Sequence, residues 1–307
     1  MGKKGFILLM LLVSLLVFSS TVSAKSKTQT ENGNQNKNQN KNAAGIRKES
    51  KNTIDVLVAG DSLTYSSVSP LGLWNQYGIT SYVCGQPGQM LSETYETLKL
   101  AFKTQKPRLV LFETNVLFRR LDKKNEKKDL MSKLYVREDS KGFKLRDGVR
   151  PYREGAYMKK TEKKEKMPEQ VETYMEKILK LCRRHGVGLV LVSTPSPKNY
   201  NYQKHNTLQE YAEKKSLTYL DMNLITKGLK IDWKTDTMDQ GDHLNLSGAK
   251  KVTEYLGKYL KNEFGLSDHR DEALYKTWKR MAKEYTRKEQ EMLKQMQAII
   301  GKEKMKS

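Results

Sequence analysis

Short apolar runs rich in β-branched residues recur along the middle of the chain, each followed by polar or turn-forming residues. Runs of this length and composition are typical of buried β-strands. The pattern predicts strands at residues 54–59, 80–84, 108–113, 187–193 and 217–221.

Helical patterns separate these runs. The segment 168–184 begins with a proline and has Gly186 just past its end, and the segment 247–261 carries apolar residues on one face. Strands that alternate with helices predict an α/β fold with a mostly parallel sheet covered on both faces. In such a sheet the ligand site lies at the carboxyl ends of the strands.

The stretch from residue 119 to 167 breaks the alternation. It is rich in Lys, Arg and Glu with aromatic residues interleaved, and it is too long for an ordinary loop. Because it follows the third strand directly, it is expected to lie over the strand ends as a lid. A disordered insertion is the alternative.

Residues 266–307 form a basic tail in which apolar side chains recur at helical spacing. This predicts an amphipathic helix, either docked on the domain, paired with itself as a coiled coil, or lying on an anionic membrane surface. The expected apolar positions are Leu274, Trp278, Met281, Tyr285, Met292, Met296 and Ile299.

The N-terminal residues are typical of an export signal, with a basic start at Lys3 and Lys4, an apolar run over 6–18, and small residues ending at Ala24. We expect a signal peptide over residues 1–24 and a secreted or cell-surface-associated protein, an uncleaved membrane anchor being the alternative. The polar segment 25–52 is rich in Asn, Gln and Lys and predicts a disordered linker. The folded domain is then expected over residues 53–265.

The formal net charge of +22 favours polyanionic partners, such as an acidic wall polymer or an anionic membrane surface. No nucleic-acid-binding motif accompanies the lysines, so nucleic acid is not expected as a partner. With two cysteines, Cys84 and Cys182, at most one internal disulfide is possible, and both are expected to be free.

The tetrapeptide Gly60-Asp61-Ser62-Leu63 closes the first predicted strand. A serine at a strand end becomes a nucleophile when a base takes its proton and donors support the oxyanion. Candidate donors follow the next two strands, namely the backbone at Gly85 and the side-chain amide of Asn115. Taken singly, each of these features also fits an ordinary turn or helix cap.

A loop at residues 239–249 supplies the candidate base, His243, with Asp239 and Asp242 beside it as candidates to orient the imidazole. Of the other histidines, His185 is placed at a helix C-terminus, and His205 and His269 lie in polar surroundings where solvation is expected.

These blocks resemble those of the SGNH (GDSL) hydrolase superfamily over about residues 53–264: Gly60 to Leu63 in the first block, then Gly85, Asn115 and His243. The resemblance implies a flavodoxin-like three-layer α/β/α sandwich, with the tail helix added. It also implies a Ser/His/Asp mechanism without a metal or another cofactor, and an oxyanion hole made by the Ser62 and Gly85 amides and the Asn115 side chain.

The chain departs from the family pattern in three blocks. In the second block Cys84 stands where an asparagine often precedes the glycine. In the third block Glu113 stands where glycine is usual. In the last block the acid normally precedes the histidine by three residues, but that position is Gln240. Asp239 or Asp242 must substitute. Asp239 is favoured because adjacent side chains in an extended segment point apart, but both remain candidates.

The expected function is that of an exported serine esterase acting on an ester, namely an O-acyl group of a cell-surface or extracellular glycan. Three alternatives stay open: a non-catalytic module that binds wall polymer or polysaccharide, an O-acyltransferase, and a membrane-surface scaffold.

Overall fold

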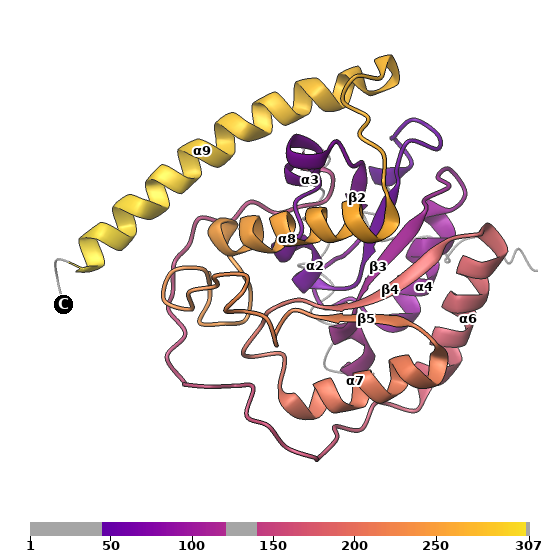
Figure 1. Ribbon diagram of the computed structural model, residues 1–307, viewed down its shortest axis with the longest axis horizontal. Helices are drawn as coiled ribbons and strands as arrows, with labels where there is room; N and C mark the ends of the chain where they lie inside the picture. The colour runs from indigo at the N-terminus through magenta and orange to yellow at the C-terminus, as the bar shows by residue number, and fades with distance from the viewer. Residues whose placement is uncertain (1–44, 121–139, 305–307) are drawn as a thin grey trace, which may run out of the picture. The chain divides into compact units, whose positions relative to one another are not determined.

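The computed structural model describes residues 45–120 and 140–304. At its centre is a five-stranded, wholly parallel sheet with the strand order β2-β1-β3-β4-β5. Figure 1 shows the strands running side by side, with helices on both sides of them. The strands match the five predicted runs: β1 Val56–Ala59, β2 Ser81–Val83, β3 Leu109–Glu113, β4 Gly188–Ser193 and β5 Thr218–Asp221.

The helices and 3-10 turns lie between the strands in the chain or follow β5. They are α2 Ser62–Ser67, α3 Pro70–Tyr77, α4 Leu91–Ala101, η1 Thr114–Phe118, α6 Gln170–His185, α7 Tyr202–Lys215, α8 Leu246–Phe264, η4 Ala273–Tyr275 and α9 Lys276–Lys304. The predicted helices at 168–184 and 247–261 correspond to α6 and α8.

Alternate strand residues face opposite layers, as the two-residue period of a strand requires. Leu57 belongs to the same core cluster as Leu98 of α4 and Ile178 of α6. Val56 instead belongs to a second cluster with Leu256 of α8. Both faces of the sheet are therefore buried under helices, and the predicted three-layer α/β/α fold is confirmed.

The predicted tail helix is present as α9 and packs on its own domain. Trp278 lies against Trp74 of α3 with ring centroids 5.4 Å apart, and the Ser69 hydroxyl donates to the Tyr285 hydroxyl at 2.8 Å. Trp278, Tyr285 and Met296 are at most 3% exposed. Of the expected apolar positions, Leu274 and Ile299 are not covered, being 63% and 41% exposed.

The insertion at 119–167 lies partly outside the described residues, because 121–139 are not described. Its segment 140–153, here called the strap, forms neither a long helix nor a strand but is hydrogen-bonded to the domain. Val83 N donates to Lys141 O, Lys144 N to Tyr65 O, Leu246 N to Arg146 O and Arg150 N to Thr237 O. The strap thus joins the end of β2, the helix α2, and the segment that precedes α8.

The folded unit begins earlier than predicted. Ile46 is fully buried in the core, and Glu49 accepts a hydrogen bond from Lys141 Nζ at 2.7 Å. The expected linker boundary at residue 52 is therefore too late, because this one apolar residue finds a site in the core. The predicted signal peptide and the rest of the linker lie outside the described residues.

Within the ranges 45–120 and 140–304, the helices include none that is long and apolar enough to cross a membrane.

Cys84 and Cys182 are both buried and are not joined in a disulfide, as predicted. Burial raises the pKa of each thiol to about 12, which keeps both protonated at neutral pH. Both therefore act as small apolar core residues.

Candidate active site

Ser62 lies at the carboxyl end of β1, in the first turn of α2. Asp61 caps this helix, because its Oδ1 accepts from Leu63 N at 3.0 Å. Gly60 lies in the sharp turn between strand and helix. No side chain would fit at this position, because a Cβ there would lie 2.7 Å from the Cβ of Glu113. The turn leaves Ser62 only 8% exposed.

His243 reaches Ser62 from a loop 181 residues further along the chain. Its Nε2 lies 2.8 Å from Ser62 Oγ, and its Nδ1 lies 2.7 Å from Asp239 Oδ2. Three polar groups in line, hydroxyl, imidazole and carboxylate, are the arrangement in which a serine can be deprotonated. The structure thus brings together two residues from opposite ends of the domain.

The loop that carries His243 contains a tight turn. Gln240 and Gly241 both have positive φ, 62° and 88°, and Met238 N donates to His243 O across the loop. This turn places Asp239, four residues before the histidine, against both the backbone N and Nδ1 of His243, at 2.6 and 2.7 Å. Asp239 thus takes the place of the usual acid, whose position in the sequence is occupied by Gln240.

Asp242 occupies a different place. Its Oδ1 lies 3.6 Å from His243 Nδ1, but at 2.6 Å it accepts from Asn199 Nδ2, in the loop after β4. Of the two candidate acids, the geometry therefore pairs the imidazole with Asp239, and Asp242 ties the loop to its neighbour.

Burial by itself raises the pKa of Asp239, but the hydrogen bonds and charge of His243, together with the charge of Arg146, outweigh burial and hold this pKa below its ordinary value. Arg146 comes from the strap, and its Nη1 lies 3.9 Å from Asp239 Oδ2. Its guanidinium also lies over the ring of Tyr65 in α2, 5.3 Å from the centroid. Arg146 therefore contacts both the helix of Ser62 and the loop of His243.

Two of the three predicted oxyanion donors, Gly85 and Asn115, follow the strands on either side of β1. Gly85 follows β2 and packs against the turn after β1 so closely that a Cβ would lie 1.9 Å from Thr64 Oγ1 and 2.5 Å from Asp61 O. Asn115, in η1 after β3, donates from Nδ2 to Asp61 Oδ2 at 2.7 Å. An amide nitrogen carries two hydrogens, so this bond orients the Asn115 side chain and leaves a second donor.

A buried charged cluster beside Ser62 was not predicted. Asp61 Oδ2 also accepts from Arg119 Nε and Nη2 at 2.9 and 2.6 Å, and Glu113, 3% exposed, accepts from Asn115 N at 2.8 Å. Burial raises the pKa of Glu113 to about 8, and the Asp61 charge adds to the effect, against hydrogen bonds from Asn115 and Thr194 and the charge of Arg119. The sequence feature that could have indicated this cluster is Glu113, which departs from the family pattern.

Two of the other three histidines have carboxylate partners. His205 Nδ1 lies 2.8 Å from Asp221 Oδ2, and His269 Nε2 lies 2.8 Å from Asp55 Oδ2. Both side chains are only 13% exposed, so the prediction that these two histidines are solvated is wrong. Each is a distant pairing that the local sequence does not show.

Asp239, Asp242 and His243 are also close enough together to hold a metal ion, their candidate ligand atoms lying within 4.8 Å of one another. Both imidazole nitrogens of His243, however, are already hydrogen-bonded, to Asp239 and to Ser62. Metal coordination would have to break one of these bonds, so the arrangement fits proton transfer better.

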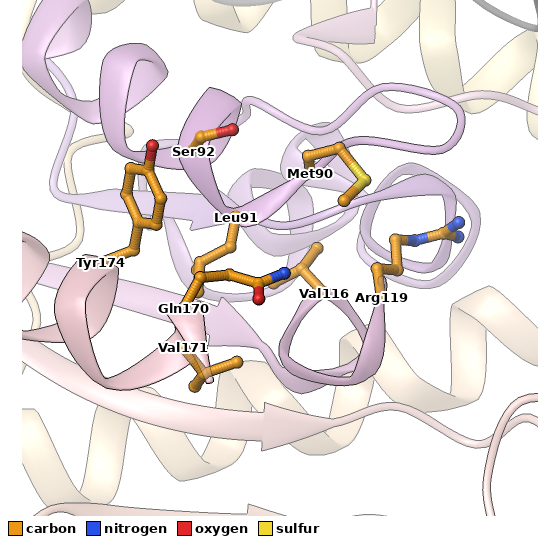
Figure 2. A pocket seen from close by; sticks show the side chains of 8 residues that line it. All are labelled: Met90, Leu91, Ser92, Val116, Arg119, Gln170, Val171 and Tyr174. Atoms are coloured by element: carbon orange, nitrogen blue, oxygen red, sulfur yellow. The ribbon is translucent and has the colours of Figure 1, made fainter. Parts of the chain in front are cut away.

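A small cavity lies on the other side of Arg119, between the starts of α4 and α6 (Figure 2). Its lining includes Leu91, Val116 and Val171, and the Arg119 guanidinium points away from them. The volume of about 10 Å³ is enough for no more than one water molecule, so an acyl group would not fit there.

No protein-family model matches the chain, and no curated protein matches it. Among solved structures, the chain is similar to the lipase/acylhydrolase from Enterococcus faecalis, with 14% identity, a TM-score of 0.40, and coverage of 69% of this chain and 97% of that one. It is also similar to a GDSL-like lipase from Bacteroides thetaiotaomicron, with 9% identity, a TM-score of 0.38, and coverage of 68% and 88%.

The roles proposed for individual residues follow from the geometry of this chain alone. That geometry places Ser62, Gly85, Asn115 and His243 at one edge of a parallel sheet. In its sequence blocks and in the arrangement of its site, the chain resembles the SGNH (GDSL) hydrolases.

Proposed function

We propose that the protein is an exported serine esterase of the SGNH type that removes O-acyl groups from a cell-surface or extracellular glycan. The observation that carries the proposal is the hydrogen-bonded series Ser62 Oγ, His243 Nε2, His243 Nδ1 and Asp239 Oδ2, with spacings of 2.8 and 2.7 Å across the imidazole. A binding module without chemistry would need no such series.

In the first half of the reaction, Ser62 Oγ attacks the ester carbonyl carbon while its proton passes to His243 Nε2. Asp239 Oδ2 accepts the hydrogen bond from Nδ1 and stabilises the imidazolium. The tetrahedral intermediate then collapses, the bond to the alcohol oxygen breaks, and the alcohol leaves with the proton from Nε2. The acyl group remains on Ser62.

In the second half, a water molecule gives a proton to His243 Nε2 and attacks the acyl carbon. The bond to Ser62 Oγ breaks, Ser62 regains its proton, and the carboxylic acid is released. The donors assigned to the oxyanion in both halves are the backbone amides of Ser62 and Gly85 and the Asn115 side chain. Asp61 keeps the Asn115 amide in one orientation.

Support for an anionic or wall-associated glycan comes from charge. The chain has a formal net charge of +22, and the strap beside the site carries several arginines. A positive surface raises the local concentration of an acidic polymer. A direct test of the substrate class is the release of acetate from isolated cell-wall glycans by the purified protein, with Ser62→Ala as the inactive control.

A serine-directed fluorophosphonate probe tests the proposed chemistry. We expect covalent labelling at Ser62, identified by peptide mass spectrometry, and no labelling of Ser62→Ala. A folded His243→Ala variant should react at least about 100-fold more slowly, because the hydroxyl loses its base. Absence of labelling in the folded native protein at every pH tried would refute the esterase and favour a binding module.

A further inference from the structure

A surface pocket of about 400 Å³ lies beside the loop that carries Asp239 and His243, and here it is called the arginine pocket. Gln240 lines it from that loop, and the rest of the lining comes from the end of the strap, Val149, Arg150, Pro151 and Arg153, and from Glu154, which follows the strap directly. Gln240 N donates to Arg150 O at 3.0 Å, and Arg150 N donates to Thr237 O at 3.1 Å. The pocket wall and the His243 loop are therefore joined by backbone hydrogen bonds.

The pocket is positively charged. Arg150 and Arg153 are exposed, and within the described residues neither guanidinium is hydrogen-bonded or ion-paired. A third cation stands at its edge, because Lys198 Nζ donates to Gln240 Oε1 at 3.4 Å. Among the lining residues, Glu154 is the carboxylate that opposes these charges.

Two guanidinium groups in one pocket suit a carboxylate or a phosphate, whose oxygens accept paired N–H donors from arginine. Beside Pro151, the ring of Tyr152 packs against that of Trp233 with centroids 6.3 Å apart, and both side chains are half-buried. Within the lining itself, Val149 and Pro151 add apolar surface to these charges, which is the composition of a site for a polar ligand of moderate size.

We propose that the arginine pocket binds an anionic group, a carboxylate or a phosphate, of the glycan whose ester Ser62 cleaves. This inference rests on the proposed function and adds a specificity site to it. Gln240 belongs to both the pocket and the His243 loop. A charged sugar unit bound in the pocket therefore belongs to the same glycan chain as the sugar unit whose ester enters the active site, at another position along that glycan. Anionic glycans are then preferred over neutral ones.

The test compares two acetylated polymers, polygalacturonate as the anionic substrate and xylan as the neutral one. The quantity measured is the ratio of kcat/KM for the anionic to the neutral polymer. In an Arg150→Gln/Arg153→Gln variant we expect this ratio to fall at least about tenfold, mainly through KM. The matched control is Arg183→Gln/Arg184→Gln at the end of α6, where two exposed arginines are removed at the same cost in net charge.

Equal ratios in the two double variants would overturn the proposal, because general attraction by the basic surface would then account for any preference. Glu154→Gln gives a test of opposite sign, in which the ratio should rise. A fall in the ratio for Glu154→Gln would also count against the site.

Binding measured without turnover separates this inference from the esterase proposal. In Ser62→Ala protein, calorimetric titration with polygalacturonate and with poly(glycerol phosphate) shows whether carboxylate or phosphate is preferred. Loss of this binding in the Arg150/Arg153 variant supports the pocket even if native protein hydrolyses no ester. If native protein hydrolyses esters but the Arg150/Arg153 variant binds the polyanion as tightly as before, the proposed pocket is refuted and the esterase proposal stands.

Discussion

Asp239 holds His243 at two points, accepting from its backbone N at 2.6 Å and facing its Nδ1 at 2.7 Å. The double contact fixes both the position of the loop and the orientation of the ring. A carboxylate in this place keeps Nδ1 protonated, so that Nε2 presents a lone pair to the Ser62 hydroxyl. The following predictions depend on this pairing and on the groups around it.

Replacing Asp239 by Asn should reduce kcat for ester hydrolysis by about 10³- to 10⁴-fold, because an amide can hold the wrong tautomer of the imidazole. Asp242→Asn should change kcat by less than about tenfold, since an amide oxygen can still accept from Asn199. Steady-state rates on a p-nitrophenyl ester, with thermal unfolding as a check on folding, decide the matter. A larger loss in Asp242→Asn would assign the acid to that residue instead.

Arg146→Met should shift the acid limb of the kcat/KM profile towards higher pH. Burial raises the pKa of Asp239, and His243 and Arg146 together lower it. Without the positive charge of Arg146, the hydrogen-bonded pair of Asp239 and His243 takes up a proton at a higher pH, and the protonated pair cannot accept the proton of Ser62. Methionine retains the apolar contact with Tyr65. The profile is measured from about pH 4 to about pH 8.

Arg146→Lys keeps a positive charge in the same place and is the matched control. Its acid limb should stay near that of the native protein. If Met and Lys shift the profile equally, the arginine acts through packing and the electrostatic explanation fails.

Glu113→Gln should become more stable relative to the native protein as the pH rises from about 5 to about 8. The folded pKa of Glu113 is raised from 4.5 to about 8, so the folded state retains a proton that the unfolded state loses in this window. The native protein therefore loses stability across it, and the glutamine variant, which has no such proton, does not.

Urea unfolding at several pH values measures this difference. The exposed Glu263 at the end of α8 provides the control, and Glu263→Gln should give a difference from native protein that does not vary with pH. A Glu113→Gln difference that is equally flat would show that the native carboxyl is ionised throughout.

Trp278→Ala should destabilise the protein by about 3–5 kcal/mol, because the indole is 3% exposed and packs against Trp74. Leu274→Ala, at a position that is 63% exposed, should change stability by no more than about 0.5 kcal/mol. Chemical denaturation measures both. A small effect of Trp278→Ala would mean that α9 leaves the domain in solution, and its apolar face would then be free for a membrane or a second chain.

The sequence by itself determined the sheet and the candidate nucleophile. Five apolar runs predicted the five strands found within residues 45–120 and 140–304, because a strand buried on both faces must be apolar along its length. Ser62 could be chosen because it directly follows the first of these runs, and chain order alone places the ends of parallel strands at one edge. The amphipathic tail was predicted for the same reason, since its periodicity is a local property of the chain.

Only the tertiary structure decided which groups pair. Asp239 and Asp242 are equivalent in a sequence, and their difference comes from two positive φ angles at Gln240 and Gly241 and from the bond to Asn199. The burial of Ile46, the docking of α9, and the position of Arg146 between Tyr65 and Asp239 likewise depend on contacts between distant segments. Hydrophobic patterning reports which residues leave water, whereas the partner of each polar group is chosen by the packing of the whole domain.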